Sequence, residues 1–236
     1  MPRLLDLFCG RFGASKAFAA RGWHCVGIDL VEPQEVPENC HFIKADILGL
    51  EWQSDGFLCT NDGFNAPVAD RFDFIWASSP CEEFSVWGMA NFHPNPKYPE
   101  LGIRLFNHTL AICEASGVPY VMENVRPAQK FVGTAENHCG PFYLWGNAVP
   151  PLLPQGITKG IKFGTASATH GMTAEERKAY RKQHPWTQAG SKSKARQAMT
   201  AQAATIPPEL SNCVADYVER LLETKVTANL QRERKP

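Results

Sequence analysis

Short apolar runs alternate with polar, glycine-containing segments along the first half of the chain. The runs with the clearest β-strand character are RLLDLFCG, WHCVGIDL, HFIKADI, RFDFIWASS and VPYVMENV. Between them, ASKAFAARG has helix composition and ends at Gly22, and IRLFNHTLAICEASG repeats its apolar residues near every 3.6 positions up to Gly117. Strands that alternate with helices predict an α/β fold with a mostly parallel central sheet covered on both faces.

After Val125 the chain becomes richer in proline and polar residues. PFYLWGNAVPPLLPQG predicts a strand with a proline-rich exit, TAEERKAYRKQ predicts a short helix, and PPELSNCVADYVERLLE predicts an amphipathic helix. We expect residues 50–70 to form an irregular loop. The predicted organisation is a core over residues 1–150, a small basic region over 151–204, a helix over 205–225 that completes the core, and a flexible tail over 226–236.

The formal charge is balanced overall but uneven along the chain. The 236 residues include 24 Lys or Arg and 24 Asp or Glu, yet residues 151–204 carry nine basic residues against only Glu175 and Glu176. The eight cysteines form no C-x-x-C pair, and no apolar stretch reaches the roughly 20 residues of a membrane span. We therefore expect a cytoplasmic monomer with reduced thiols, without a signal peptide, a metal or a membrane partner.

The turn after the first predicted strand has the composition of a ligand-binding loop. Phe8, Gly10 and Gly13 lie in this turn, and glycine lets a backbone approach a ligand closely. Phe12 occupies a place where a nucleotide-binding fingerprint favours glycine, so the signal is weaker than that of a phosphate loop.

Two carboxylates follow the next two strands. Asp29 ends the second strand, where it could accept hydrogen bonds from ribose hydroxyls, and Asp46 follows the third, where it could accept from an adenine amine. The alternative for each is a helix N-cap or a turn former.

Cys81 follows the fourth strand and Glu123 ends the fifth. Because the carboxyl ends of parallel strands meet at one edge of a sheet, we expect these two side chains to be neighbours. A lone cysteine is usually a buried inert thiol and a lone glutamate a solvated surface group. The occurrence of both at adjacent strand ends favours a joint chemical role.

The motifs at these strand ends resemble those of the cytosine-C5 methyltransferases, which use S-adenosylmethionine. The resemblance rests on DLFCGRFG, VGID, KADI, SSPCEEFS and MENV in this order, and on ATIPPELSNCVADYV, which resembles the closing motif of that family. It covers roughly residues 3–126 and 204–218. Short members of the family are typical of phages and prophages, and some belong to restriction-modification systems.

The resemblance implies a Rossmann-like S-adenosylmethionine-dependent methyltransferase fold with a small basic insert, and DNA as the partner. It implies that Cys81 is the nucleophile and that Glu123 contacts N3 of the cytosine. The implied cofactor-binding residues are Phe8, Gly10, Gly13, Asp29, Leu30, Asp46, Ile47, Ser79 and Pro80. The implied substrate- and DNA-binding residues are Ser85, Asn124, Arg126, Lys178, Arg181, Lys182, Lys194 and Arg196.

The chemistry explains these residue types. C5 of cytosine is a poor nucleophile, and a thiolate that adds to C6 makes it enamine-like when N3 is protonated or hydrogen-bonded. A carboxyl that donates to N3 must be protonated, and burial at a strand end favours that form. After methyl transfer a base removes the C5 proton and the cysteine is released. The cytosine must be flipped out of a duplex or lie in a single strand.

Three positions depart from the family pattern. The family usually has an arginine pair after Glu-Asn-Val to hold the cytosine O2, and the corresponding HCGPFYLWGN contains no arginine, so that Arg126 or Arg196 would have to substitute. Glu82 replaces the usual Gln or Asn after the cysteine. GNAVPPLL spells the closing motif but comes too early, and we assign that role to Thr205–Val218.

The basic region is the expected DNA-binding segment. Its lysines and arginines suit phosphate contacts, which add affinity without sequence choice, so we expect little sequence discrimination. The alternative is a solvated basic loop. Two other functions stay open: a relative that modifies RNA or transfers another group from a cofactor analogue, and a catalytically silent DNA- or cofactor-binding protein.

Overall fold

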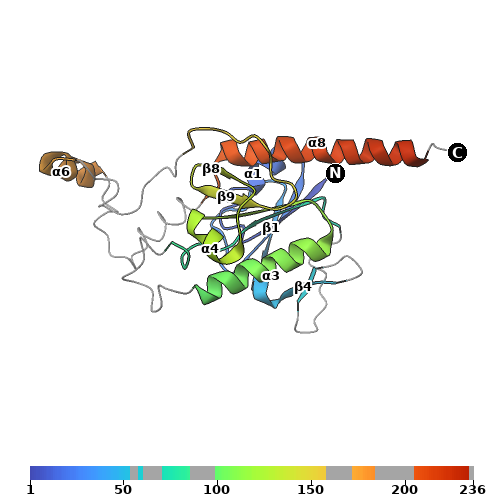
Figure 1. Cartoon of the computed structure of the whole chain (residues 1–236), viewed down its shortest axis with the longest axis horizontal. Helices are drawn as coiled ribbons and strands as arrows, with labels where there is room; N and C mark the ends of the chain where they lie inside the picture. Colours follow the sequence, from blue (N-terminus) through green and yellow to red (C-terminus); the bar gives the residue numbers. More distant parts are fainter. Residues whose placement is uncertain (54–57, 61–70, 86–98, 158–171, 184–204, 234–236) are drawn as a thin grey trace. The chain divides into compact units, whose positions relative to one another are not determined.

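The structure, a computed structural model, describes residues 1–53, 58–60, 71–85, 99–157, 172–183 and 205–233. The chain divides into two units, Met1–Ile157 together with Ile206–Pro236, and Thr158–Thr205. The elements of the first unit are β1 (Arg3–Leu7), α1 (Ser15–Ala19), β2 (His24–Asp29), β3 (Cys40–Lys44), the 3₁₀ helix η1 (Ile47–Gly49), β4 (Leu50–Trp52), β5 (Leu58–Thr60), β6 (Phe74–Ser78), α3 (Glu100–Ser116), β7 (Tyr120–Asn124), the 3₁₀ helix η2 (Arg126–Ala128), α4 (Gln129–Val132), β8 (Asn137–Cys139), β9 (Phe142–Trp145) and α8 (Pro208–Glu233) (Figure 1).

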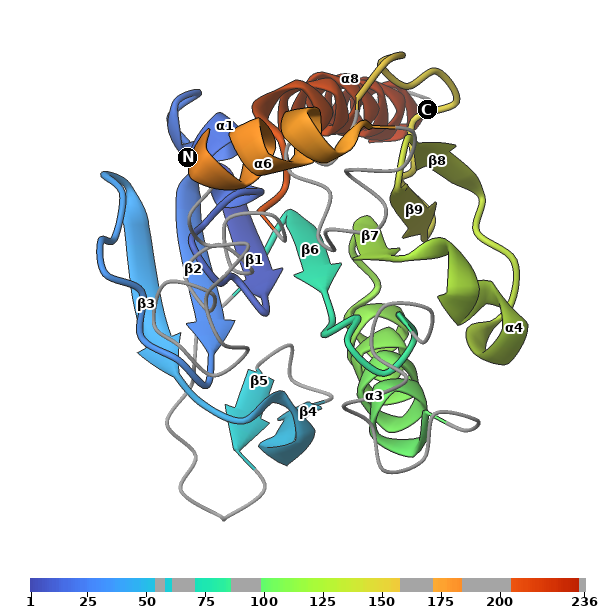
Figure 2. The ribbon, with the colours of Figure 1, turned by 90° about the vertical axis from the view of Figure 1, so that its left-hand side faces the viewer.

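The central sheet has the strand order β3-β2-β1-β6-β7-β9-β8. The first five strands run parallel, whereas β9 is antiparallel to both β7 and β8. The predicted, mostly parallel Rossmann-like sheet is therefore confirmed. Because the chain moves outward from β1 to β3 and then resumes at β6 on the other side, the strand order reverses beside β1. Figure 2 shows β1, β2, β3 and β6 pointing to the same edge, where open α/β sheets bind ligands.

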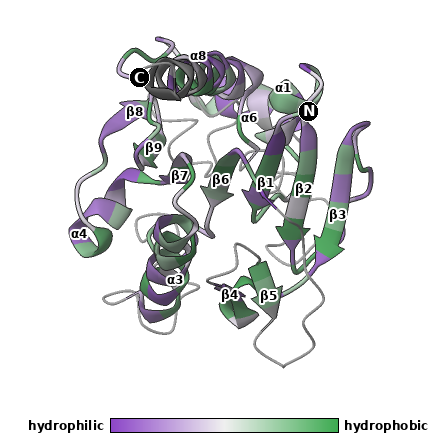
Figure 3. Ribbon diagram, turned by 90° about the vertical axis from the view of Figure 1, so that its right-hand side faces the viewer, coloured by the Kyte–Doolittle hydropathy of each residue, from purple (hydrophilic) through white to green (hydrophobic). Residues whose placement is uncertain are grey.

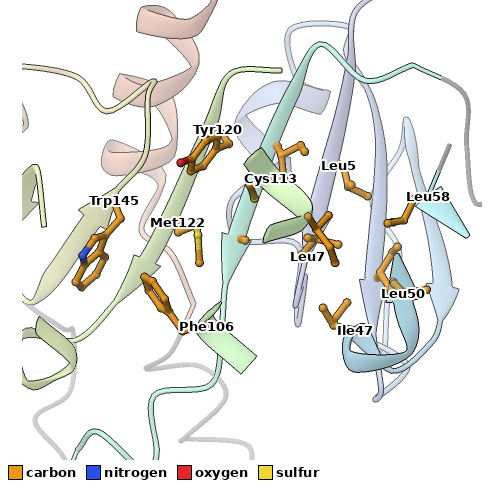
Figure 4. Close-up of a cluster of buried hydrophobic side chains, with 14 of the residues drawn as sticks. Leu5, Leu7, Ile47, Leu50, Leu58, Phe106, Cys113, Tyr120, Met122 and Trp145 are labelled. Atoms are coloured by element: carbon orange, nitrogen blue, oxygen red, sulfur yellow. The ribbon is translucent and has the colours of Figure 1, made fainter. Parts of the chain in front are cut away.

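Successive strand residues face two separate cores, as the period of two requires. Leu5 of β1 and Phe106 of α3 belong to one buried cluster on one face (Figure 4). Leu4 packs with Phe18 of α1 and Val214 of α8 on the other. Helix α3 accordingly lies on one side of the sheet and α8 on the other (Figure 1), and α3 carries both hydrophobic and hydrophilic residues (Figure 3).

The segment predicted to be an irregular loop contains regular structure. Strands β4 and β5 pair antiparallel, with Leu50 opposite Thr60. Leu50 and Leu58 are fully buried, and the ring of His108 on α3 bonds the Leu50 carbonyl oxygen at 2.8 Å. The prediction was wrong for Leu50–Trp52 and Leu58–Thr60, because two three-residue strands are too short to show a period, while tertiary burial of their leucines stabilises them. The rest of the predicted loop, residues 54–57 and 61–70, lies outside the described residues.

Helix α8 is longer than the predicted closing helix. It continues to Glu233, through most of the residues that we predicted to be a flexible tail. No glycine or proline occurs between position 209 and position 235, so nothing in the local sequence terminates the helix. Its first half is anchored on the sheet unit: Arg21 pairs with Asp216 at 2.8 Å and the Trp23 indole donates to Glu219 at 3.0 Å.

The described part of the second unit is helix α6 (Ala174–Gln183), which confirms the helix predicted there. A reciprocal capping box starts it. Thr173 N–H donates to the Glu176 carboxylate at 2.7 Å, and Glu176 N–H donates to the Thr173 hydroxyl at 3.3 Å. The bond from the Thr173 backbone lowers the pKa of Glu176. Contacts within the first turn of α6 therefore fix where this helix begins.

Candidate active site at the carboxyl edge of the sheet

The turn between β1 and α1 folds over the end of β2. Phe8 N–H and Cys9 N–H both donate to the Ile28 carbonyl oxygen, at 2.9 and 3.2 Å. Phe8 and Gly10 adopt positive φ angles of 62° and 49°, and a Cβ added at Gly10 would meet nothing within 4 Å. The turn thus leaves open space above Gly10, as the predicted cofactor loop requires. Gly13 lies in the same turn and is half-buried.

The structure explains why this turn tolerates a phenylalanine. Phe12 also has a positive φ, 59°, and is fully buried. Its ring occupies the position that a Cβ on Gly27 of β2 would take. Because Gly27 has no side chain, the Phe12 ring fits beneath the turn, away from the open space above Gly10.

Asp29 links the turn to the end of β2. One carboxylate oxygen accepts from Gly10 N–H and the other from Val31 N–H, each at 3.0 Å. Asp29 therefore stabilises the turn, as its alternative interpretation predicted. A carboxylate oxygen has a further lone pair, so Asp29 can still accept from a ligand hydroxyl. The neighbouring Leu30 and Val31 are exposed by 58% and 73%, and present apolar surface beside this carboxylate.

Asp46 also has the role that its alternative interpretation gave it, that of a helix N-cap. Its side chain caps η1 by accepting from Leu48 N–H at 3.0 Å. Ile47 is buried in the core next to α3, so only its backbone can face a ligand.

Asp6, which the sequence pattern did not single out, lies in β1 just before the turn. It is buried, and the Ser15 hydroxyl of α1 donates to its carboxylate at 2.5 Å. Burial raises the pKa of Asp6 to about 7; the nearby charge of Asp29 also raises it, and the Ser15 bond opposes the shift. An acidic residue inside the apolar run RLLDLF is the signal that could have revealed it.

Strands β6 and β7 bring Cys81 and Glu123 to neighbouring strand ends. Ser78, the last residue of β6, pairs with Glu123, and Cys81 follows three residues later. Glu123 is 8% exposed. Cys81 is half-buried and Pro80 exposed. The two residues thus stand at the ends of adjacent strands, and the predicted joint role of their side chains stays a prediction.

A buried amide joins these two strand ends. The Asn124 NH₂ group donates to the carbonyl and the hydroxyl of Ser79, both at 3.0 Å. Its side-chain oxygen accepts from Val125 N–H at 2.8 Å. Asn124 is fully buried, so its side chain has a structural role in joining the two strand ends. The predicted contacts of Asn124 with the substrate and of Ser79 with the cofactor stay predictions.

The residues after Cys81 form a tight turn, Cys81–Ser85, which we call the nucleophile turn. The Cys81 carbonyl oxygen accepts from Phe84 N–H at 3.1 Å and from Ser85 N–H at 3.0 Å. Phe84 is fully buried, whereas Ser85 is half-buried and Glu82 exposed. Ser85 is therefore close to Cys81 along the turn, as the predicted substrate contact requires.

The predicted basic contacts are only partly described. Arg126 is exposed at the start of η2, directly after β7. Lys178 and Lys182 are exposed on α6, which also contains Arg181. Lys194 and Arg196 lie outside the described residues. In place of an arginine, β9 sets Tyr143 opposite Asn124, and the ring of His138 stacks on Tyr143 with centroids 4.8 Å apart.

The described residues also bear on metal binding and membrane insertion. No group of three or more His, Cys, Asp or Glu side chains among them could hold a metal ion. Within the same residues no helix has the length and apolar character needed to cross a membrane.

Comparison with known proteins gives a partial sequence relative. No family model matches the chain. A stretch of 90 residues is 36% identical to a probable DNA (cytosine-5)-methyltransferase of Frog virus 3 (isolate Goorha). The match covers 38% of this chain and spans about a third of the viral protein's length, 33%.

Similar solved structures include two methyltransferases. One is the Burkholderia thailandensis 1,6-didemethyltoxoflavin-N1-methyltransferase, with 15% identity, a TM-score of 0.31 and coverage of 61% of this chain and 54% of that one. The other is the antibiotic-resistance methyltransferase Kmr, with 15% identity, a TM-score of 0.27 and coverage of 52% and 58%.

The buried Asp6 predicts a specific pH dependence of stability. Between about pH 4 and pH 7 the folded protein keeps a proton on Asp6 that the unfolded chain releases, so this contribution to stability falls as the pH rises and levels off above 7. Its full size is at most about 4 kcal/mol. Asp6→Asn should remove this contribution while an oxygen remains to accept from Ser15. Urea unfolding of both proteins at pH 5 and pH 8 measures it, and parallel pH profiles would contradict it.

Proposed function

We propose that this protein is an S-adenosylmethionine-dependent methyltransferase that acts on C5 of cytosine in DNA, with Cys81 as its nucleophile. The observation that carries the proposal is the placement of Cys81 and Glu123 at adjacent strand ends beside the point where the strand order reverses. The partial similarity to a probable viral DNA (cytosine-5)-methyltransferase supports the same reaction.

The residues of the β1–α1 turn fit the proposed cofactor. The open space above Gly10 leaves room for the adenosine. The remaining lone pairs of Asp29 can accept from its ribose hydroxyls, and the exposed apolar Leu30 can contact the face of its aromatic ring. Asp46 would accept from the adenine amine. When bound, S-adenosylmethionine supplies an electrophilic methyl group, and the protein's contribution at this turn is to bind and orient it.

The nucleophile turn and β7 would perform the base chemistry. The Cys81 thiolate adds to C6 of cytosine while the protonated Glu123 carboxyl donates to N3, which neutralises the charge that develops on the ring. Carbon C5 becomes nucleophilic and accepts the methyl group. Loss of the C5 proton to a base then breaks the C6–sulfur bond, frees Cys81 as a thiolate and returns the N3 proton to the Glu123 carboxylate. C6 of a paired cytosine is hidden within the base stack of a duplex, so the cytosine must enter the site unpaired or flipped out.

The acceptor could instead be cytosine in RNA, or the transferred group could come from a cofactor analogue. The exposed Glu82 and an arginine-free β9 are the features that favour such a relative. Mass spectrometry of nucleosides from DNA and RNA treated with the protein and S-adenosylmethionine separates these possibilities. A protein that modifies neither would be the catalytically silent binder.

Replacing the nucleophile provides the central test. Cys81→Ser should abolish methyl transfer to DNA while S-adenosylmethionine affinity stays within about twofold, because the thiol bonds to the base rather than to the cofactor. DNA containing 5-fluorocytosine should form a covalent complex with the wild-type protein, since fluorine cannot leave as a proton does. Gel electrophoresis and radiolabelled methyl transfer give the readouts. Undiminished turnover of the serine variant would refute the assignment.

The cofactor residues are tested by conservative substitution. Asp29→Asn and Asp46→Asn keep one acceptor oxygen for the turn but remove the negative charge and half of the acceptor capacity. Each should weaken S-adenosylmethionine binding by about 1–3 kcal/mol in calorimetric titration. The matched control is Glu114→Gln, which makes the same acid-to-amide change at an exposed position near the carboxyl end of α3. Unchanged affinity in both aspartate variants would place the cofactor elsewhere.

The second unit is proposed to bind DNA phosphates through α6. Lys178→Gln combined with Lys182→Gln should weaken binding about equally for unrelated DNA sequences, and should lower the salt slope by about 0.9 for each phosphate that is no longer neutralised. Arg220→Gln combined with Lys225→Gln removes the same charge from exposed positions of α8. Fluorescence anisotropy over a salt series compares the pairs. Equal reductions in both would show a general charge effect without an α6 site.

A further inference from the structure

The nucleophile turn is held at both of its ends. Two residues before its start, Ser79 is hydrogen-bonded to Asn124 of β7. At its other end, Glu83 and Phe84 contact the first turn of α3. The Glu83 carboxylate accepts from Gly102 N–H at 2.7 Å. The position of the turn thus depends on α3 as well as on β7.

The first turn of α3 needs the acceptor that Glu83 provides. The N-cap of α3 is Pro99, which makes no side-chain capping bond. The first N–H groups of a helix have no partner within the helix, and a negative charge is favourable at that end. Glu83 lies 19 positions before Gly102 in the sequence, so this capping bond is a tertiary contact.

Glycine at position 102 permits the second contact. A Cβ added there would stand 3.1 Å from two ring atoms of Phe84 and 3.4 Å from the Glu83 Cβ. Phe84 is fully buried, so its ring has little room to withdraw. The absence of a side chain at Gly102 therefore lets the nucleophile turn lie directly against α3.

These contacts act on Cys81 through a short path. The Cys81 carbonyl oxygen accepts from the N–H groups of Phe84 and Ser85, so residues 81–85 form one hydrogen-bonded turn. A shift of Glu83 would displace Cys81 relative to Glu123 of β7. A misplacement of about 1 Å in a reacting group can cost about 10²-fold in rate.

We infer that Glu83 is a positioning residue, which holds the Cys81 thiol in register with Glu123 by anchoring the nucleophile turn to the start of α3. This inference rests on the proposed role of Cys81. It assigns to Glu83 a function that depends on its acceptor oxygen rather than on its charge.

The experiment compares four variants. Glu83→Ala should lower kcat for methyl transfer about 10- to 100-fold and leave KM for S-adenosylmethionine within about twofold. Glu83→Gln, which retains an acceptor oxygen, should recover most of kcat. Glu100→Ala removes an exposed acidic residue that belongs to the first turn of α3 itself and should leave kcat unchanged. Gly102→Ala should lower kcat as Glu83→Ala does, even though alanine is the better helix former.

A second measurement is independent of catalysis. The rate at which iodoacetamide alkylates Cys81, followed by peptide mass spectrometry across pH 6–9, should change several-fold in Glu83→Ala and not in Glu100→Ala. Equal reductions of kcat in Glu83→Ala and Glu100→Ala would show that Glu83 only stabilises the start of α3. That result would overturn the inference. Unchanged kcat and alkylation in Glu83→Ala would also overturn it. If Cys81→Ser retained full activity, the proposed function would fail instead.

Discussion

The candidate site depends on one buried amide. Asn124 is fully excluded from solvent, and a buried amide that lacks hydrogen-bond partners is costly. Its NH₂ group therefore needs the carbonyl and hydroxyl of Ser79, and its oxygen needs Val125 N–H. This requirement holds the end of β6 against the end of β7. Cys81 follows the end of β6 by three residues and Glu123 lies at the end of β7, so both stand at the edge that this amide holds together.

A second set of polar groups organises the other half of the edge. Asp29 accepts from Gly10 N–H, and the buried Asp6 accepts from Ser15 across the same turn. The two carboxylates differ in environment. Asp29 stands beside exposed residues at the end of β2, whereas burial raises the pKa of Asp6. One is therefore available to a ligand, and the other serves to join β1 to α1.

The two halves meet through α3. The helix receives Glu83 from the nucleophile turn at its first turn, and farther along His108 bonds the Leu50 carbonyl oxygen just after η1. Asp46, the proposed contact to adenine, caps η1. A single helix thus contacts both the proposed base-binding side and the proposed cofactor side of the site. This rigid connection is consistent with a reaction in which two substrates must be aligned.

The apolar runs by themselves determined the parallel sheet, and the strand pattern predicted that Cys81 and Glu123 stand at the ends of neighbouring strands. Both are local properties: strand character follows from a few adjacent residues, and parallel strands place their carboxyl ends together. Only the tertiary structure decided three contacts: those of the buried Asn124 amide, the bond from Ser15 to Asp6, and the contact of Glu83 with Gly102. Each joins residues that are distant in the chain or buries a polar group, and burial depends on what packs from elsewhere. The extent of β4, β5 and the end of α8 was decided in the same way, because short strands and an uninterrupted helix carry no boundary signal of their own.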